Sequence, residues 1–348
     1  MRKRFFSKLA IVMSTALAVS GCFCPIDKAF VNAETIQDED DSYYDDDSDY
    51  DDSYDDSTDD SYDDSTDDSY DDSTDDSDNE ETTGTKIDDI KLSSSELQAF
   101  VKESDSDENG YISQSEAEKI TYVSISKKAS QSDLTQIIKL YPNISELMWN
   151  AGTLTKLTFP KNNIKRLNIT SKAASQLVIS GINQKLNNLS YTAQGSKKYA
   201  FNFAKGSAYK KVEDFNLMGK QINGVKLSNA EVGTLYVTDT SAKKIDASSD
   251  KIINLWVQNN KKLSSFTVRN CSKLKSVSCA YNALSRLNIS GCPKLLSVSC
   301  DRNKLTKLDI SKYKNLKSIS CGQNKLKKFD ISKNKKLISV YCNDNKLT

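Results

Sequence analysis

The chain has 348 residues, and its 48 basic and 48 acidic side chains give a formal net charge of zero. It contains no histidine, which excludes histidine-ligated zinc and nucleophilic catalysis by serine–histidine or cysteine–histidine pairs. The even balance conceals an asymmetry. Residues 38–81 hold 25 acidic and no basic residues, whereas residues 82–348 hold 43 basic and 21 acidic ones. The sequence therefore predicts a basic folded region behind an acidic segment.

The N-terminus has the pattern of an export signal. Four basic residues within the first eight precede an apolar stretch, Leu9 to Ser20, that is too short to span a membrane as a helix. Two processing sites are consistent with this pattern. Residues 1–21 form a lipoprotein signal if Cys22, which follows Val-Ser-Gly, is lipidated, and residues 1–33 form an ordinary signal peptide if cleavage follows Ala33. The first predicts a membrane-anchored lipoprotein at the cell surface and the second a secreted protein, so both predict export.

Residues 34–85 form a low-complexity linker. The octet Asp-Asp-Ser-Tyr-Asp-Asp-Ser-Thr occurs three times between residues 51 and 74. Because the carboxylates repel one another and tyrosine is the one apolar residue of the acidic part, no core can offset the ordering entropy. We expect a disordered spacer. Weak calcium buffering, glycosylation of the hydroxyl groups and docking onto the basic region are further hypotheses for it.

The next region, residues 86–143, carries a calcium-loop motif. The segment from Asp105 to Glu116 fits the pattern D-x-[DN]-x-[DN]-G-x5-E of an EF-hand loop without a departure. Calcium prefers about six to eight oxygen ligands, and Gly110 permits the sharp turn that gathers them. The predicted ligands of one structural calcium ion are Asp105, Asp107, Asn109, the backbone carbonyl of Tyr111, Ser113 and Glu116. A calcium-responsive switch and an unoccupied loop are the alternatives.

Apolar residues around this loop predict short helices. Beyond it, Val123 and Ile125 predict a strand, and residues 134–140 predict an amphipathic helix. Because the first coil of a solenoid needs a cover with one polar face, we interpret residues 86–143 as an N-terminal cap.

Residues 144–348 have the periodicity of stacked coils. In the first part, leucines at a regular half-coil spacing are each followed two positions later by a large apolar residue, which predicts two short strands per coil. The leucines are Leu147, Leu157, Leu167 and Leu177, and the following residues are Trp149, Phe159, Ile169 and Ile179. Residues 193–200 interrupt the rhythm and predict a loop insertion.

The later coils are more regular. They begin at residues 212, 232, 253, 274, 295, 316 and 337, and from 274 onward each reads Leu-x-x-(Val/Ile)-x-Cys-x-x-Asn-x-Leu with a constant period. One unit cannot bury its apolar edge alone, whereas stacked units can. A second apolar triplet in each unit, such as Leu284, Leu287 and Ile289, predicts the second strand. The sequence thus predicts a mostly β solenoid of about ten coils, each of roughly 20–21 residues, a length typical of solenoid repeats.

Two columns of side chains recur through these coils. Alternation along the strand places the cysteines inward, and the asparagines lie where the chain turns and can satisfy backbone groups there. The columns are Cys279, Cys300, Cys321 and Cys342, and Asn282, Asn303, Asn324 and Asn345. Neighbours in such a column are about 4.8 Å apart with parallel side-chain directions, which suits a disulfide poorly. We therefore expect the cysteines of the coils, including Cys271 and Cys292, to be free and buried.

The calcium-loop motif and the Leu-x-x-Val-x-Cys-x-x-Asn-x-Leu units together resemble bacterial exported leucine-rich-repeat proteins with an EF-hand-like N-terminal cap. The resemblance covers residues 87–348. It implies a leucine-rich-repeat solenoid that acts as a surface adhesion or binding protein, and it implies no enzymatic activity.

The sequence offers one candidate ligand surface. Arg286, Lys307 and Lys328 recur at one position of successive coils, and Tyr341 closes a column of outward serines. Repeated charge favours an anionic polysaccharide, although an extracellular protein ligand is equally consistent. We expect no nucleic-acid partner for an exported chain. The alternative function is a structural one, in which copies associate through the C-terminal coil, since Leu347 and Thr348 end the sequence without a polar cap.

Overall fold

The computed structural model describes residues 83–227 and 230–348, which lie within one compact unit, Asp76–Thr348. The predicted export signal, the lipidation of Cys22, the cleavage after Ala33 and residues 34–82 of the acidic linker lie outside the described residues and stay predictions. Within the described ranges, no helix combines the length and the apolar character needed to cross a membrane.

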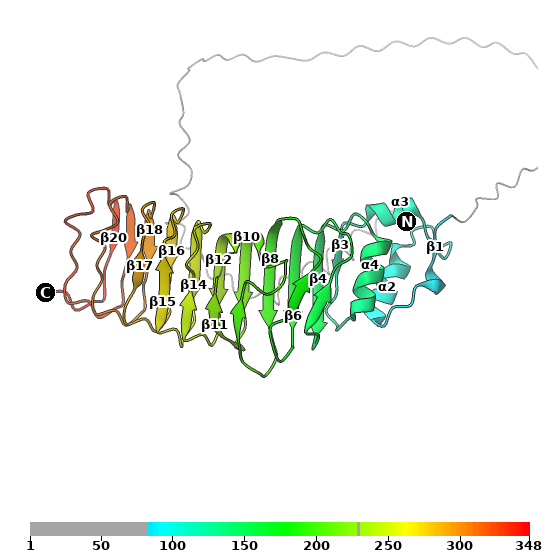
Figure 1. The fold of residues 1–348 in the computed structure, drawn as a ribbon, viewed down its shortest axis with the longest axis horizontal. Coiled ribbons are helices and arrows are strands. Elements are labelled where there is room, and N and C mark those ends of the chain that lie inside the picture. Colours follow the sequence, from blue (N-terminus) through cyan, green and yellow to red (C-terminus); the bar gives the residue numbers. More distant parts are fainter. Residues whose placement is uncertain (1–82, 228–229) are drawn as a thin grey trace, which may run out of the picture. The chain divides into compact units, whose positions relative to one another are not determined.

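The described residues form a row of stacked coils that begins at a helical cap (Figure 1). One side of the coils builds an 11-stranded parallel sheet in which each strand pairs with those of the preceding and following coils. Its strands are β3 (Tyr122–Ser124), β4 (Glu146–Gly152), β6 (Arg166–Ser171), β8 (Leu186–Ala193), β10 (Lys211–Met218), β12 (Glu231–Thr238), β14 (Asn254–Gln258), β16 (Ser276–Ser278), β18 (Ser297–Ser299), β19 (Ser318–Ser320) and β20 (Ser339–Tyr341).

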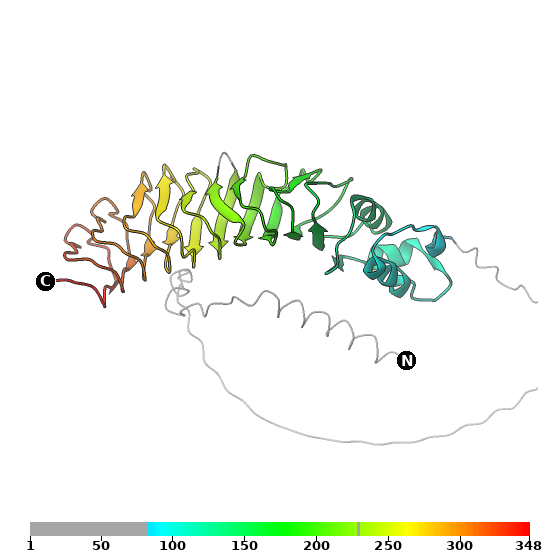
Figure 2. The same cartoon turned by 90° about the horizontal axis from the view of Figure 1, so that it is seen from below.

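The opposite side of the coils carries shorter parallel pairings, visible when the molecule is turned (Figure 2). They comprise the pair β5 (Lys156–Thr158) and β7 (Val178–Ser180), and a five-stranded sheet of β9 (Tyr199–Asn202), β11 (Ile222–Lys226), β13 (Lys244–Asp246), β15 (Ser265–Arg269) and β17 (Asn288–Ser290). The mostly β leucine-rich-repeat solenoid of about ten coils is thereby confirmed.

Three helices build the cap. Helices α2 (Ser95–Ser104) and α3 (Gln114–Lys119) flank the predicted calcium loop, and α4 (Gln131–Leu140) follows β3. Helices α3 and α4 both begin with a capping box, in which a serine and an acidic residue three positions later satisfy each other's backbone N–H groups. Strands β1 (Thr85–Lys86) and β2 (Tyr111–Ile112) form a separate antiparallel pair, and a 3-10 turn, η2 (Ile87–Asp89), follows β1. Since β3 belongs to the long sheet, the cap and the first coil share backbone pairing.

The predicted asparagine column bridges the later coils. Asn303 donates to the carbonyls of Cys279 and Cys300, at 2.9 and 3.1 Å, and accepts from the N–H of Leu284 at 3.0 Å. Asn282, Asn324 and Asn345 likewise connect neighbouring coils. Each side chain supplies turn carbonyls with donors that no strand reaches, as the sequence predicted.

The column begins one coil earlier than the repeat pattern indicated. Asn260 is fully buried, donates to the carbonyls of Val237 and Gln258, and accepts from Thr240. Its spacing to the next core leucine, Leu263, is one position longer than the Asn-x-Leu of the later coils, so the pattern missed it.

All six cysteines of the coils are free. Cys342 is partly buried and the other five are buried, so the prediction of free, packed thiols is confirmed.

The coil between β8 and β10 is the longest one from β4 onward. The register pairs Leu167 with Leu189 and then Leu189 with Phe215, which lies several positions further along the chain than in any neighbouring pair of strands. The extra length encloses five aromatic rings whose centroids lie 4.7 to 6.2 Å apart, namely Tyr191, Phe201, Phe203, Tyr209 and Phe215. The interruption predicted at residues 193–200 lies here, although Tyr199 and Ala200 already belong to β9.

Two details of the predicted coils are wrong. The coil placed at Ile253 begins at Ile252, because the register joins Leu235 to Leu255 and Leu255 to Val277. Ile252 is therefore the fully buried residue.

The predicted second strand is also missing from the last coils, where residues 305–310 and 326–331 form no strand. There Asp309 and Asp330 accept the N–H groups of Ser311 and Ser332, at 2.9 and 2.8 Å. This local turn uses donors that a strand ladder would need.

Candidate metal centre and interaction surface

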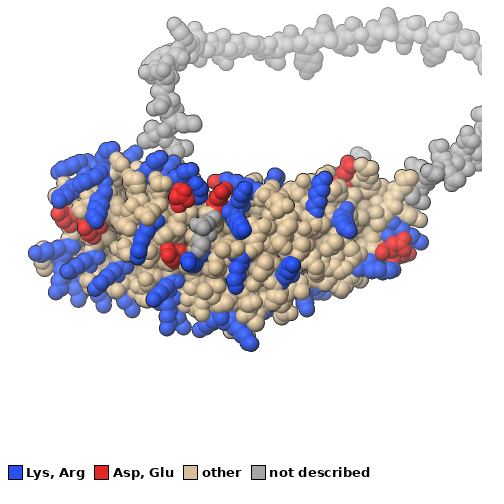
Figure 3. All heavy atoms as spheres, viewed as in Figure 1, with Lys and Arg blue, Asp and Glu red and all other residues tan. Residues whose placement is uncertain are grey.

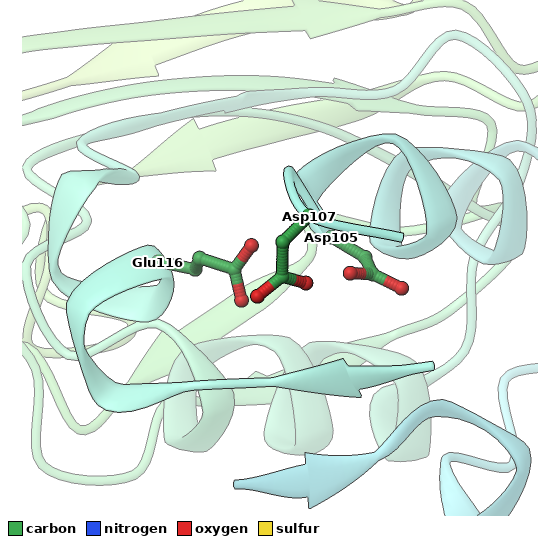
Figure 4. Close-up of side chains that lie close together, drawn as sticks. All are labelled: Asp105, Asp107 and Glu116. Carbon is green, nitrogen blue, oxygen red and sulfur yellow. The ribbon is translucent and has the colours of Figure 1, made fainter. Parts of the chain in front are cut away.

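The predicted calcium loop connects α2 to α3, and three of its carboxylates converge (Figure 4). One oxygen each of Asp105, Asp107 and Glu116 lies within 4.8 Å of the others. The backbone winds through two residues in the left-handed region, Glu108 at φ 60° and Gly110 at φ 86°. Convergent carboxylate oxygens are the ligands that a hard divalent cation prefers.

Hydrogen bonds hold the first half of the loop in this shape. Asp105 accepts the N–H groups of Asn109 and Gly110, at 3.2 and 2.9 Å, and Asp107 accepts the N–H of Asn109 at 3.2 Å. The side-chain oxygen of Asn109 accepts the N–H of Tyr111 at 2.8 Å. A carboxylate oxygen has more than one lone pair, so these bonds leave acceptor capacity for a cation.

Glu116 closes the loop from the first turn of α3. One of its oxygens accepts the N–H and hydroxyl of Ser106, and the other accepts the N–H and hydroxyl of Ser113 at 3.0 and 2.9 Å. Burial alone would raise the pKa of Glu116, but these four hydrogen bonds lower it to about 2. The carboxylate is therefore ionised at neutral pH before any metal binds.

Asp107 experiences the opposite balance. The N–H of Asn109 lowers the pKa of Asp107, yet the loss of solvation and the proximity of Asp105 and Glu116 outweigh it, and the pKa is raised. Three carboxylates close enough to perturb one another are stabilised by a divalent cation. The loop thus fits calcium in its donor atoms and charge. The assignment of all six predicted ligands, including Asn109, Tyr111 and Ser113, stays a prediction.

Carboxylate acceptors connect the cap to the coils and hold it together. The carboxylate of Glu96 on α2 accepts the N–H groups of Ser126 and Lys127, which follow β3, at 3.0 and 2.8 Å. The fully buried Asp133 on α4 accepts from Ser93 and Ser130. The repeat and loop patterns missed both residues. The Ser-x-x-Asp spacing before α4 could have indicated Asp133, whereas Glu96 has no local signal.

The structure separates the residues of the predicted ligand surface. Arg286, Lys307 and Lys328 are exposed at the same position of three successive coils, after the buried leucines that leave the long sheet. Tyr341, which is 49% exposed, lies in β20 of the long sheet itself. The three basic residues therefore form one row, and Tyr341 belongs to another face.

Basic side chains gather over the last coils (Figure 3). Residues 261–348 contain 20 Lys or Arg and four Asp or Glu, and all 20 cations are exposed. Within the part of the chain that the structure describes, none of these cations forms an ion pair. Two of the four acids, Asp309 and Asp330, are engaged by Ser311 and Ser332, whose hydrogen bonds lower the pKa of each carboxyl.

A second surface feature had no counterpart in the sequence reasoning. Tyr236 of β12 and Trp256 of β14 are neighbours in register on the outward face of the long sheet. Their ring centroids are 6.2 Å apart and their planes differ by 11°. The two residues belong to coils that lack the Leu-Cys-Asn pattern, so their alignment depends on the register of the sheet.

No family model matches the chain, and no curated protein matches it. Among solved structures, an internalin, InlF, from Listeria monocytogenes aligns over 77% of this chain and 80% of its own, with 15% identity and a TM-score of 0.48. The functional domain of InlJ from Listeria monocytogenes, which includes a cysteine ladder, aligns over 70% and 59%, with 16% identity and a TM-score of 0.38. A leucine-rich-repeat protein from Leptospira interrogans aligns over 63% and 70%, with 15% identity and a TM-score of 0.28. With scores in this range, the fold assignment rests on the coordinates of this chain.

Proposed function

We propose that this protein is an exported, non-catalytic binding protein whose last coils hold an anionic polymer. The observation that carries the proposal is the charge distribution of residues 261–348, where 20 exposed cations face four acids. Such an excess, without ion-pair partners among the described residues, produces a positive potential along the surface.

The arrangement of the cations favours a linear ligand. Neighbouring coils are about 4.8 Å apart, so Arg286, Lys307 and Lys328 form one row of like charges. Lys304, Lys325 and Lys346 form a second row at another position of the same coils. Like charges at this spacing are destabilising unless offset. A polymer with repeated negative charges, such as an acidic polysaccharide or a wall phosphate polymer, would offset both rows at once.

Calcium has a structural role in this proposal. Asp105, Asp107 and Glu116 supply carboxylate oxygens, and Asn109, the carbonyl of Tyr111 and Ser113 complete the set of ligands. Bound calcium would neutralise the carboxylates and hold α2 and α3 in one relative orientation. Since α3 leads directly into β3, this would stabilise the first strand of the long sheet.

The location of the protein follows from the N-terminal sequence. Lipidation of Cys22 would anchor it at the cell surface, and cleavage after Ala33 would release it. In a fractionation experiment, Cys22→Ala would move a lipoprotein out of the membrane fraction and leave an ordinarily cleaved protein where it was.

Charge-neutralising variants test the binding surface. We expect the triple variant Arg286→Gln, Lys307→Gln, Lys328→Gln to bind linear polyphosphate and a sulfated polysaccharide more weakly than the wild type. Because each phosphate contact releases condensed counterions, the slope of log K against log salt should fall by about two for three lost contacts. The matched control is Lys161→Gln, Lys165→Gln, Lys205→Gln, which removes three exposed lysines from earlier coils and should change little.

Two results would overturn this proposal. One is polymer binding that does not weaken as salt increases. The other is binding that the triple variant leaves intact and Trp256→Ala abolishes, which would move the ligand site to the aromatic pair of the long sheet.

A further inference from the structure

Strand β2 lies inside the predicted calcium loop, and its pairing partner lies outside the loop. Thr85 pairs with Ile112, and Lys86 pairs with Tyr111, in an antiparallel register. The N–H of Ile87 extends the pairing by donating to the carbonyl of Gly110 at 2.9 Å. The sequence holds one loop of this type, so a segment that precedes α2 provides the strand that braces it.

This pairing determines where the carbonyl of Tyr111 points. Successive residues of an extended strand direct their backbone groups to opposite sides. The carbonyl of Gly110 faces β1, so the backbone groups of Tyr111 face the other way. The N–H of Tyr111 does so, because it donates to the side chain of Asn109 inside the loop at 2.8 Å. The carbonyl of Tyr111 therefore lies on the side of the loop where the carboxylates converge.

Gly84 permits the close approach of this brace. A Cβ atom at Gly84 would lie 2.6 Å from the carbonyl oxygen of Ile112 and 3.1 Å from the backbone nitrogen of Ser113. Both atoms belong to the backbone of the loop, so a side chain would displace either the loop or β1. The loop positions next to this contact, Tyr111 and Ser113, are two of the predicted calcium ligands.

We propose that residues 84–87 are part of the metal centre and act as positioning residues for the carbonyl of Tyr111. They bind no cation themselves. Gly84 allows the approach, and the N–H of Ile87 fixes the peptide plane before Tyr111. The inference rests on the proposed calcium site and adds to it a set of residues outside the loop motif.

Two variants and a control test this inference in the full chain. Gly84→Ala introduces the Cβ that meets the loop backbone. Ile87→Pro removes the N–H that donates to Gly110, and it suits the local backbone because Lys86 is extended, at φ −61° and ψ 128°. The control is Gly224→Ala in β11, where a Cβ meets ordinary contacts at 3.6 and 3.7 Å.

The readout is a single peptide group. Tyr111–Ile112 is the one Tyr-Ile pair in the sequence, so labelling tyrosine carbonyls with 13C and isoleucine nitrogens with 15N gives one coupled NMR signal. That signal shifts when calcium binds the Tyr111 carbonyl, and the carboxylates of the acidic linker do not contribute to it. We expect the calcium concentration at the midpoint to rise about tenfold to a hundredfold in both variants and to stay within about twofold in the control, as for lost supporting contacts at other metal sites.

The possible outcomes separate the two proposals. If calcium shifts the wild-type signal and both variants respond at the wild-type concentration, residues 84–87 do not position the carbonyl. If calcium leaves the wild-type signal unchanged and Glu116→Gln alters no calcium binding by the chain, the calcium site itself is wrong and this inference falls with it.

Discussion

The early and the late coils fill the same kind of interior with different side chains. Between β4 and β10, large rings such as Trp149 and Phe201 fill the coils, and the offset between successive strands varies from coil to coil. From β16 onward, cysteine and asparagine columns replace the rings, and every offset is the same. The asparagine bridges explain the fixed length, because each requires the same turn in both coils that it connects. Aromatic packing requires volume and tolerates a longer chain.

The largest effect should come from the aromatic interior. Phe201 is fully buried and contacts Tyr191, Phe203, Tyr209 and Phe215. We expect Phe201→Ala to lower the free energy of unfolding by about 3 to 5 kcal/mol, as for other large buried rings. Urea unfolding followed by the fluorescence of Trp149 and Trp256 measures it. A loss no greater than that of Phe329→Ala, a half-buried ring of the late coils, would contradict the contrast between the two regions.

An intermediate effect should come from the asparagine column. Asn303→Ala leaves the carbonyls of Cys279 and Cys300 and the N–H of Leu284 without this partner. Unsatisfied buried backbone groups should cost about 2 to 4 kcal/mol in total. The same unfolding measurement applies, with the exposed Asn187→Ala as the matched control, expected within about 0.5 kcal/mol of the wild type. Equal losses in the two variants would show that the column does not hold the late coils together.

The smallest effect concerns the cysteine column. Burial raises the pKa of the thiols of Cys279 and Cys300 far above the usual value, and it raises the pKa of Cys321 to about 12. At pH 8 these groups should be protonated and unreactive, whereas the partly buried Cys342 should react. Alkylation with iodoacetamide and peptide mapping would show the order. Labelling of Cys300 as fast as Cys342 in the folded protein would contradict this account of the interior.

The sequence predicted most where a local pattern repeats. The Leu-x-x-Val-x-Cys-x-x-Asn-x-Leu units carry their own register, so the columns at Cys300 and Asn303 were predictable. Ile252 and Asn260 were missed because their coil departs from that spacing by one position. The candidate metal loop was visible as a motif, but its bracing strand was not. Gly84 acts through a backbone contact with Ile112, on the far side of α2 in the sequence, which no local pattern reports.

The most direct test of the central claim is amide hydrogen exchange with and without calcium. The account predicts that calcium slows exchange in residues 84–124, which include the loop, its brace and β3, and leaves residues 274–348 unchanged. Variant Glu116→Gln should lose the effect. Unchanged exchange in residues 84–124, or equal slowing along the whole solenoid, would contradict a calcium site that stabilises the cap and the first strand.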